Sequence, residues 1–199
     1  MKSQNKDPDL EKSYANSDIA YLLTPAAQCR YVLAAHSVRD CDHIVEIGGR
    51  FTPITQYLTK APKSVLVLDP KMPAYSADSF FGRPCDIRHV TAKFQNWDFE
   101  LSDKNYALVI LGCSIKHFSD NDTQREHEWQ KLIALINGAA ITVLEYATDW
   151  RNGADNFAAM RDRINARKVL QIDMDISSNT DMDTPYTLRR FLVFESTAA

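Results

Sequence analysis

The chain has 199 residues, a formal net charge of −3 and 25% charged residues. This length suits one domain with a substantial core, and the acidic balance argues against a nucleic-acid partner, because a duplex-binding protein carries a basic excess. No apolar run reaches the roughly 18 residues of a membrane span. The first twenty residues are polar, so we expect no membrane insertion and a cytoplasmic location.

The cysteines predict neither a metal centre nor a disulfide framework. They are Cys29, Cys41, Cys85 and Cys113. These positions are widely spaced, contain no Cys-x-x-Cys pair and form no zinc pattern with histidine. We therefore expect no bound metal.

Residues 1–41 are predicted to form an N-terminal helical segment. A first helix is followed by a second one over residues 24–38, where a threonine and then Pro25 are typical of a helix start. We expect this segment to act as a lid over a substrate pocket, with Tyr14 and Tyr21 facing the substrate. Ordinary packing is the alternative role for both tyrosines.

Residues 42–199 are predicted to form one α/β domain, because short apolar strands alternate with helical periods. The expected strands cover residues 43–47, 64–68, 89–94, 106–111, 140–146, 170–176 and 188–194. The last two follow each other without a helix between them. The pattern therefore predicts a doubly wound, Rossmann-like sheet of seven strands, mostly parallel and with a C-terminal antiparallel hairpin.

The segments between the strands predict three helices and one loop. The helices are expected to start at Thr52-Pro53, to follow the cap residues 119–122, and to cover residues 154–167. The second of these is predicted to end at Asn137-Gly138 in a left-handed conformation. Residues 70–84 contain three prolines and a glycine, and we expect a loop there.

The strongest functional signal follows the first expected strand, in the stretch Glu46-Ile47-Gly48-Gly49-Arg50-Phe51-Thr52. Ligands of parallel sheets bind beyond the carboxyl ends of the strands. Glycines there let a ligand approach the backbone, and a following helix presents free N–H groups. Asp69 closes the second strand about twenty residues later, where a carboxylate can accept both hydroxyls of a ribose.

This segment resembles the first motif of class I S-adenosylmethionine-dependent methyltransferases, in which an acidic residue precedes a Gly-x-Gly loop. Glu46 matches the acid, Gly48 the first glycine and Asp69 the ribose-binding acid. The resemblance continues through residues 111–118, with a small residue, an apolar one, His and Phe, and covers about residues 42–195 in all. The loop departs from the family in being shorter, since the third glycine or small residue is missing.

The resemblance implies a methyltransferase with S-adenosylmethionine as its cofactor and a small molecule as its substrate. It implies cofactor contacts at Glu46, Gly48, Gly49, Asp69, Pro70, Gly112 and Cys113. Two positions compete for the adenine amine. Asn96-Trp97 follow the third expected strand, and Trp97 could stack on a purine, whereas Asp86 has the better chemistry but lies only 17 residues past Asp69.

The catalytic group is less clearly marked. His117 lies just past the fourth expected strand, where a base could take a proton from the acceptor. A neutral histidine that hydrogen-bonds its own loop is the alternative. Tyr146 and Asp149, at and after the end of the fifth strand, are expected to line the substrate pocket together with Tyr14 and Tyr21.

Two alternatives to methyl transfer remain. The stretch from Gly48 to Thr55 is also similar to the loop of nicotianamine synthase-like enzymes, which transfer another arm of S-adenosylmethionine. The shortened loop alternatively indicates a binding protein that has the methyltransferase fold without the activity.

Overall fold

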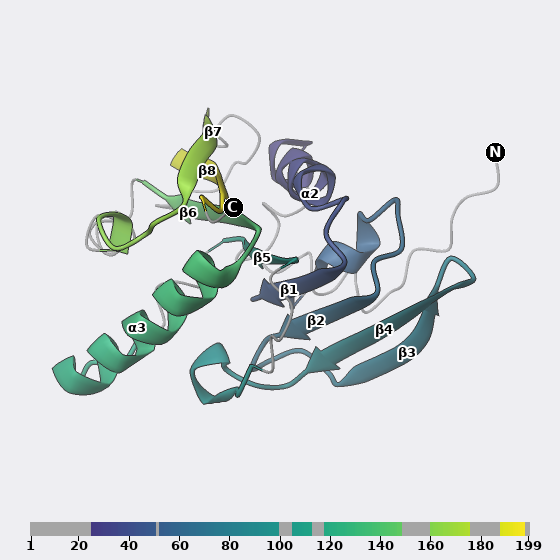
Figure 1. The fold of residues 1–199 in the computed structure, drawn as a ribbon, viewed down its shortest axis with the longest axis horizontal. Coiled ribbons are helices and arrows are strands. Elements are labelled where there is room, and N and C mark those ends of the chain that lie inside the picture. The colour runs from purple at the N-terminus through teal and green to yellow at the C-terminus, as the bar shows by residue number, and fades with distance from the viewer. Residues whose placement is uncertain are drawn as a thin grey trace.

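Eight strands form a single sheet in the order β3-β4-β2-β1-β5-β6-β8-β7 (Figure 1). This computed structural model describes residues 25–50, 52–99, 105–112, 118–148, 160–175 and 188–197. The strands are β1 (His43–Ile47), β2 (Ser64–Leu68), β3 (Tyr75–Phe80), β4 (Arg83–Val90), β5 (Tyr106–Ile110), β6 (Ile141–Ala147), β7 (Arg167–Asp175) and β8 (Leu188–Glu195). The expected helix before residue 24 lies outside the described residues.

The sheet has the predicted doubly wound topology. Strands β4, β2, β1, β5 and β6 are mutually parallel, and their carboxyl ends lie at one edge. Strand β8 is antiparallel to both β6 and β7, so the expected C-terminal hairpin is confirmed. The predicted count of seven strands is wrong, because β3 adds an eighth strand antiparallel to β4.

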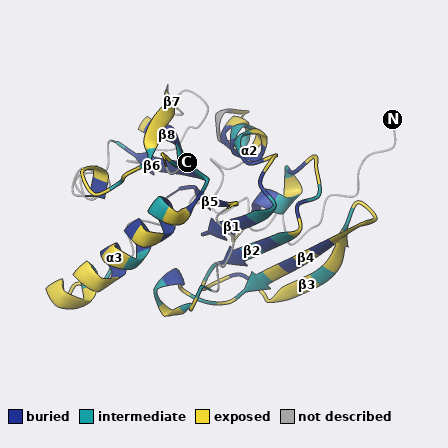
Figure 2. Ribbon diagram, in the orientation of Figure 1, coloured by how far each residue is buried: buried dark blue, intermediate teal, exposed yellow. Residues whose placement is uncertain are grey.

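Two helices cover opposite faces of this sheet (Figure 1). Helix α2 (Pro25–Ser37) packs one face through Tyr31, Ala34 and the following Val38, in a cluster with residues such as Val65. Helix α3 (Asp122–Gly138) packs the other face. Because both faces are covered, the central strands are buried throughout, whereas β3 and β7 at the two edges are largely exposed (Figure 2).

Helix α3 begins as expected and ends differently. Asn121 caps its first turn by accepting the Gln124 N–H. The predicted left-handed end is wrong, because Gly138 is not among the glycines with positive φ and Ala139 is extended. A glycine is instead required at position 138 because a side chain would not fit there: an added Cβ would lie 2.8 Å from the hydroxyl oxygen of Tyr106. That hydroxyl donates a hydrogen bond of 2.6 Å to the carbonyl oxygen of Leu135.

The helix expected from Thr52-Pro53 is reduced to one 3-10 turn, η2 (Ile54–Gln56). Ile54 and Leu58 are buried, but the chain leaves the helical conformation after Gln56. Only a few residues separate Pro53 from Pro62, and a helix of one turn gains few hydrogen bonds for its nucleation cost.

The expected loop over residues 70–84 is also wrong in part, because β3 and the start of β4 occupy it. Phe81 and Gly82 both have positive φ, at 51° and 71°, and connect the two strands as a tight hairpin. The third expected strand therefore lies at Arg83–Val90 instead of residues 89–94. Phe94 is the start of a 3-10 turn, η3 (Phe94–Asn96).

The polar helix predicted over residues 154–167 ends earlier in the structure than the sequence suggests. Among the described residues from 160 onwards, the helical conformation stops at Arg161, a turn follows, and Arg167 is the first residue of β7. No helix in the described part of the chain is long and apolar enough to cross a membrane.

Candidate functional site

The ends of three neighbouring strands bring the glycine loop, Asp69 and Gly112 to the same edge of the sheet. Ile47 at the end of β1 lies beside Leu68 of β2 and Ile110 of β5. The strand order reverses at β1, since β2 lies on one side of it and β5 on the other. In doubly wound sheets the ligand crevice lies at this switch point, beyond the carboxyl ends of the strands.

Gly48 turns the chain sharply at the end of β1. Its φ is 89°, a conformation that a residue with a Cβ rarely adopts, and its N–H donates to the Leu68 carbonyl oxygen at 2.8 Å. Gly49 then packs against the sheet, because an added Cβ would lie 2.7 Å from both Glu46 Oε2 and Val67 Cγ1. The shortened loop thus folds back over the face of the sheet that α2 covers.

Glu46 anchors this loop from its buried side. Its side chain is 1% exposed, and its Oε2 accepts the Ile54 N–H at 2.7 Å. Burial raises the pKa of Glu46 to about 8, the Ile54 N–H opposes this shift, and the negative charge of Asp69 adds to it. The structure therefore places Glu46 behind the loop, where it anchors the backbone.

Asp69 follows β2 at the same edge and is only partly buried. Its Oδ1 accepts the Lys71 N–H at 2.7 Å, and its own N–H donates to the Val90 carbonyl oxygen at 3.2 Å. The first bond orients the carboxylate, which retains further acceptor sites on both oxygens, and the second fixes the backbone of Asp69 at this edge. Pro70, the neighbouring candidate, is exposed in the turn that follows.

Gly112 follows β5 at the same edge, directly after Leu111. Its φ is 80°, and a Cβ added there would meet no atom of the described residues within 4 Å, its two chain neighbours aside. Its N–H donates to Glu145 Oε2 in a short hydrogen bond. The described residues thus leave space beside Gly112, and β6 holds this glycine through Glu145.

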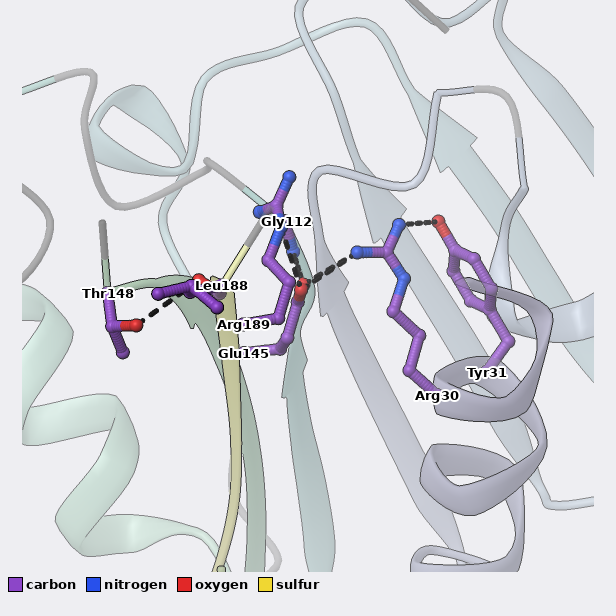
Figure 3. A network of polar contacts seen from close by, with 7 residues as sticks. All are labelled: Arg30, Tyr31, Gly112, Glu145, Thr148, Leu188 and Arg189. Carbon is purple, nitrogen blue, oxygen red and sulfur yellow. Dashed lines mark hydrogen bonds and ion pairs between the residues drawn. The ribbon is translucent and has the colours of Figure 1, made fainter. Parts of the chain in front are cut away.

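Glu145 is the centre of a buried charge cluster at this edge (Figure 3). Arg30 Nη1 lies 2.9 Å from each carboxylate oxygen, and Arg189 Nε lies 3.6 Å from Oε1. Burial alone would raise the pKa of Glu145, but the two guanidiniums and the Gly112 N–H together lower it below its ordinary value. The carboxylate is therefore ionised at neutral pH, unlike Glu46.

Tyr146 faces the other side of the sheet, since successive residues of a strand point in opposite directions. It is buried in the cluster beneath α3 and hydrogen-bonds Arg190, which in turn binds Asp173 at 2.6 and 3.0 Å. Burial raises the pKa of Tyr146 above its ordinary value. The structure thus separates Tyr146 from Glu145 and Gly112.

Asn96 and Trp97 also lie apart from the glycine loop. They line a cavity of about 660 Å³ on the face of the sheet, together with His43, Ser64 and Tyr106, the first residues of β1, β2 and β5. The lining residues identified in the described part of the chain include neither Gly48 nor Asp69. Asp86, the alternative adenine contact, lines the same cavity from the middle of β4.

The remaining candidates lie outside the described residues. They are Tyr14, Tyr21, Cys113, His117 and Asp149. The sequence analysis did not predict the charge cluster of Arg30, Glu145 and Arg189. A signal was present, because Arg30 shares the spacing of Ala34 and Val38 on the buried side of α2, and buried charges require partners.

No family model and no curated protein matches the chain. Solved structures match it at low sequence identity. The N-methyltransferase NodS of Bradyrhizobium japonicum WM9, solved with S-adenosyl-L-homocysteine, aligns with a TM-score of 0.61 at 14% identity, covering 98% of this chain and 100% of that chain. A S-adenosylmethionine-dependent methyltransferase of Clostridium acetobutylicum aligns with a TM-score of 0.59 at 6% identity, covering 96% and 99%.

A third match is the 1,6-didemethyltoxoflavin-N1-methyltransferase of Burkholderia thailandensis, solved with 1,6-didemethyltoxoflavin and S-adenosylhomocysteine. It aligns with a TM-score of 0.57 at 13% identity, covering 96% of this chain and 86% of that chain. The chain is thus similar along nearly its whole length to these structures. It has the Rossmann-like fold of class I S-adenosylmethionine-dependent methyltransferases.

Proposed function

We propose that the protein is an S-adenosylmethionine-dependent methyltransferase that acts on a small-molecule acceptor. The observation that carries this proposal is the arrangement of Gly48, Asp69 and Gly112 at the ends of β1, β2 and β5, around the switch point of the sheet. Two of the neighbouring structures hold S-adenosylhomocysteine, the product of methyl transfer, and one of them also holds a small acceptor.

The residues at this edge fit the adenosine part of such a cofactor. The turn at Gly48, and the space that the described residues leave beside Gly112, allow a ligand to approach the backbone. The carboxylate of Asp69 is oriented by the Lys71 N–H and has acceptor sites left for two ribose hydroxyls. We assign Glu46 an indirect role, because it is buried and bonded to Ile54, so it supports the loop instead of touching the ligand.

When bound, S-adenosylmethionine supplies a methyl group on a positively charged sulfur, which an acceptor can attack directly. The chain then has to hold the acceptor in line with that methyl group and exclude water. His117, a few residues after Gly112 in the sequence, is our candidate for the base that takes the acceptor's proton.

A second candidate function is ligand binding without turnover. The specific observation in its favour is the inward fold of the shortened loop, where Gly49 lies against Glu46 and Val67. In this arrangement the acidic residue, Glu46, has a structural role. A regulatory or binding protein could retain the adenosine site at Asp69 and have no turnover.

Calorimetry with S-adenosylmethionine and S-adenosylhomocysteine tests the proposal first, and a turnover screen over small acceptors tests it second. We expect binding of both nucleosides and methylation of at least one acceptor. Binding without turnover would support the second candidate. Mass spectrometry of the nucleoside product separates the chemistries, because methyl transfer yields S-adenosylhomocysteine whereas transfer of the other arm yields methylthioadenosine. Absence of binding to either nucleoside would reject both functions.

A further inference from the structure

Glu145 joins three elements at the carboxyl edge of the sheet. It is a fully buried residue of β6, and its carboxylate contacts α2 through Arg30, β8 through Arg189 and the chain just after β5 through the Gly112 N–H (Figure 3). No other carboxylate in the described part of the chain is fully buried between two arginines. This junction lies at the same edge as the proposed cofactor site.

The two main contacts of Glu145 share one oxygen atom. Oε2 accepts both the Gly112 N–H and one N–H of Arg30, while Oε1 accepts from Arg30 and faces Arg189. A movement of α2 that shifts Arg30 therefore changes the position of the atom that holds Gly112. Gly112 itself has a φ of 80°, and among the described residues, its two chain neighbours aside, no atom lies within 4 Å of a Cβ built on it.

Stability alone is a weak explanation for such a cluster. Burying charges is costly, and well-packed apolar side chains of similar size are often as stable as a buried ion pair. A carboxylate has a property that apolar groups lack, since it can accept hydrogen bonds from a backbone N–H and a guanidinium at once. The ionised form also matches the environment, because Arg30, Arg189 and the Gly112 N–H overcome the effect of burial and lower its pKa.

We propose that Glu145 is a positioning residue, which holds the Gly112 peptide in place at the carboxyl edge of the sheet and thereby shapes the cofactor site. The proposal rests on the proposed function, since Gly112 is one of the residues that we assign to that site. It also predicts that α2 and Gly112 are coupled through Arg30.

The test is Glu145→Gln, with Glu126→Gln as the matched control. Glu126 undergoes the same change from carboxylate to amide, and it too accepts two N–H groups of an arginine, Arg163 at 2.9 and 3.3 Å, but on the exposed side of α3. In Glu145→Gln, one of the two acceptor oxygens becomes an amide NH2 group, which faces N–H donors in either orientation of the amide. The negative charge that strengthens the bonds from Arg30 and Gly112 is also lost.

Amide hydrogen exchange measured by NMR is the readout that does not depend on the cofactor. We expect Gly112 in Glu145→Gln to exchange about tenfold faster or more relative to Leu108, a buried residue of the preceding strand β5. Affinity for S-adenosylhomocysteine should fall by a similar factor. Glu126→Gln should leave both within about twofold of the wild type.

Arg30→Lys supplies a second variant, which keeps the positive charge but loses the planar fork. We expect it to change Gly112 exchange in the same direction by a smaller factor, and it carries the test if Glu145→Gln does not fold. Equal acceleration of Gly112 and Leu108 would show a general loss of stability and overturn the proposal. If the wild type binds no S-adenosylhomocysteine, the proposed function fails, and the exchange data still decide whether Glu145 holds Gly112.

Discussion

At the residue scale, two buried glutamates on the same face of the sheet have opposite ionisation. Glu46 has a backbone N–H and the negative charge of Asp69 near it, and burial raises its pKa to about 8. Glu145 is equally buried, but Arg30 and Arg189 lower its pKa. The partner, and not the depth of burial, decides which carboxyl group is charged at neutral pH.

The raised pKa of Glu46 gives a pH dependence of stability with a definite sign. The unfolded chain loses this proton near the ordinary value of 4.5, and the folded protein loses it near 8. The free energy of unfolding should therefore fall as pH rises between these values, by up to about 1.4 kcal/mol per pH unit. Glu46→Gln, measured by urea unfolding without ligand, should remove this loss. Parallel curves for both proteins from pH 5 to pH 8 would contradict it.

Asp69→Ala should weaken binding of S-adenosylhomocysteine. Two hydrogen bonds to a charged group are each worth about 1.5–3 kcal/mol, so the dissociation constant should rise at least about tenfold. The control is Asp98→Ala, because Asp98 lines the separate cavity that contains Trp97. Calorimetry that finds the larger loss in Asp98→Ala would move the cofactor site to that cavity.

At the element scale, the sequence predicts best those strands that are apolar on both faces. Residues 43–47 and 64–68 are placed correctly because nearly every position is buried. Strand β4 was misplaced, since only Cys85 and Ile87 are buried among charged and exposed neighbours. Its pairing with β2 overrides this weak pattern, and so does the hairpin that joins it to β3.

The end of α3 offers a test of an element boundary that depends on space. Alanine normally stabilises a helix relative to glycine, but in Gly138→Ala the new Cβ would lie 2.8 Å from the hydroxyl oxygen of Tyr106. We expect a loss of about 1–3 kcal/mol in the free energy of unfolding. In a Tyr106→Phe background the same change should cost much less. An equal cost in both backgrounds, measured by denaturant unfolding, would refute this account.

Part of the candidate site could also be predicted from the sequence, because it depends on the strands that are easiest to locate. Gly48 and Asp69 follow strands that the apolar pattern locates, so their common edge could be predicted. The contact between Arg30 and Glu145 joins residues 115 positions apart, and one sequence contains no pattern that links them. Asn96 and Trp97 were chosen because they follow the strand expected at residues 89–94. That strand ends at Val90 in the structure, and the two residues line the separate cavity instead.

At the scale of the whole molecule, β8 completes the sheet between β6 and β7. Its alternate residues reach both clusters, with Phe191 and Val193 beneath α2 and Leu192 and Phe194 beneath α3. A chain that stops after Asn179 lacks this strand and exposes both clusters. We expect it to be insoluble or to lack a cooperative unfolding transition in circular dichroism. A soluble fragment that unfolds cooperatively would contradict the structural role of β8.

The position of β8 also has a consequence for synthesis on the ribosome. Strands β1, β2, β4, β5 and β6 can assemble in order as they emerge, but β7 pairs with β8 alone, and β6 has an uncovered edge until β8 arrives. The nascent chain must therefore expose the edge of β6 until residues 188–195 have been made and have left the ribosome. Such edges are sites of aggregation, so the yield of folded protein should depend on chaperone capacity during this interval.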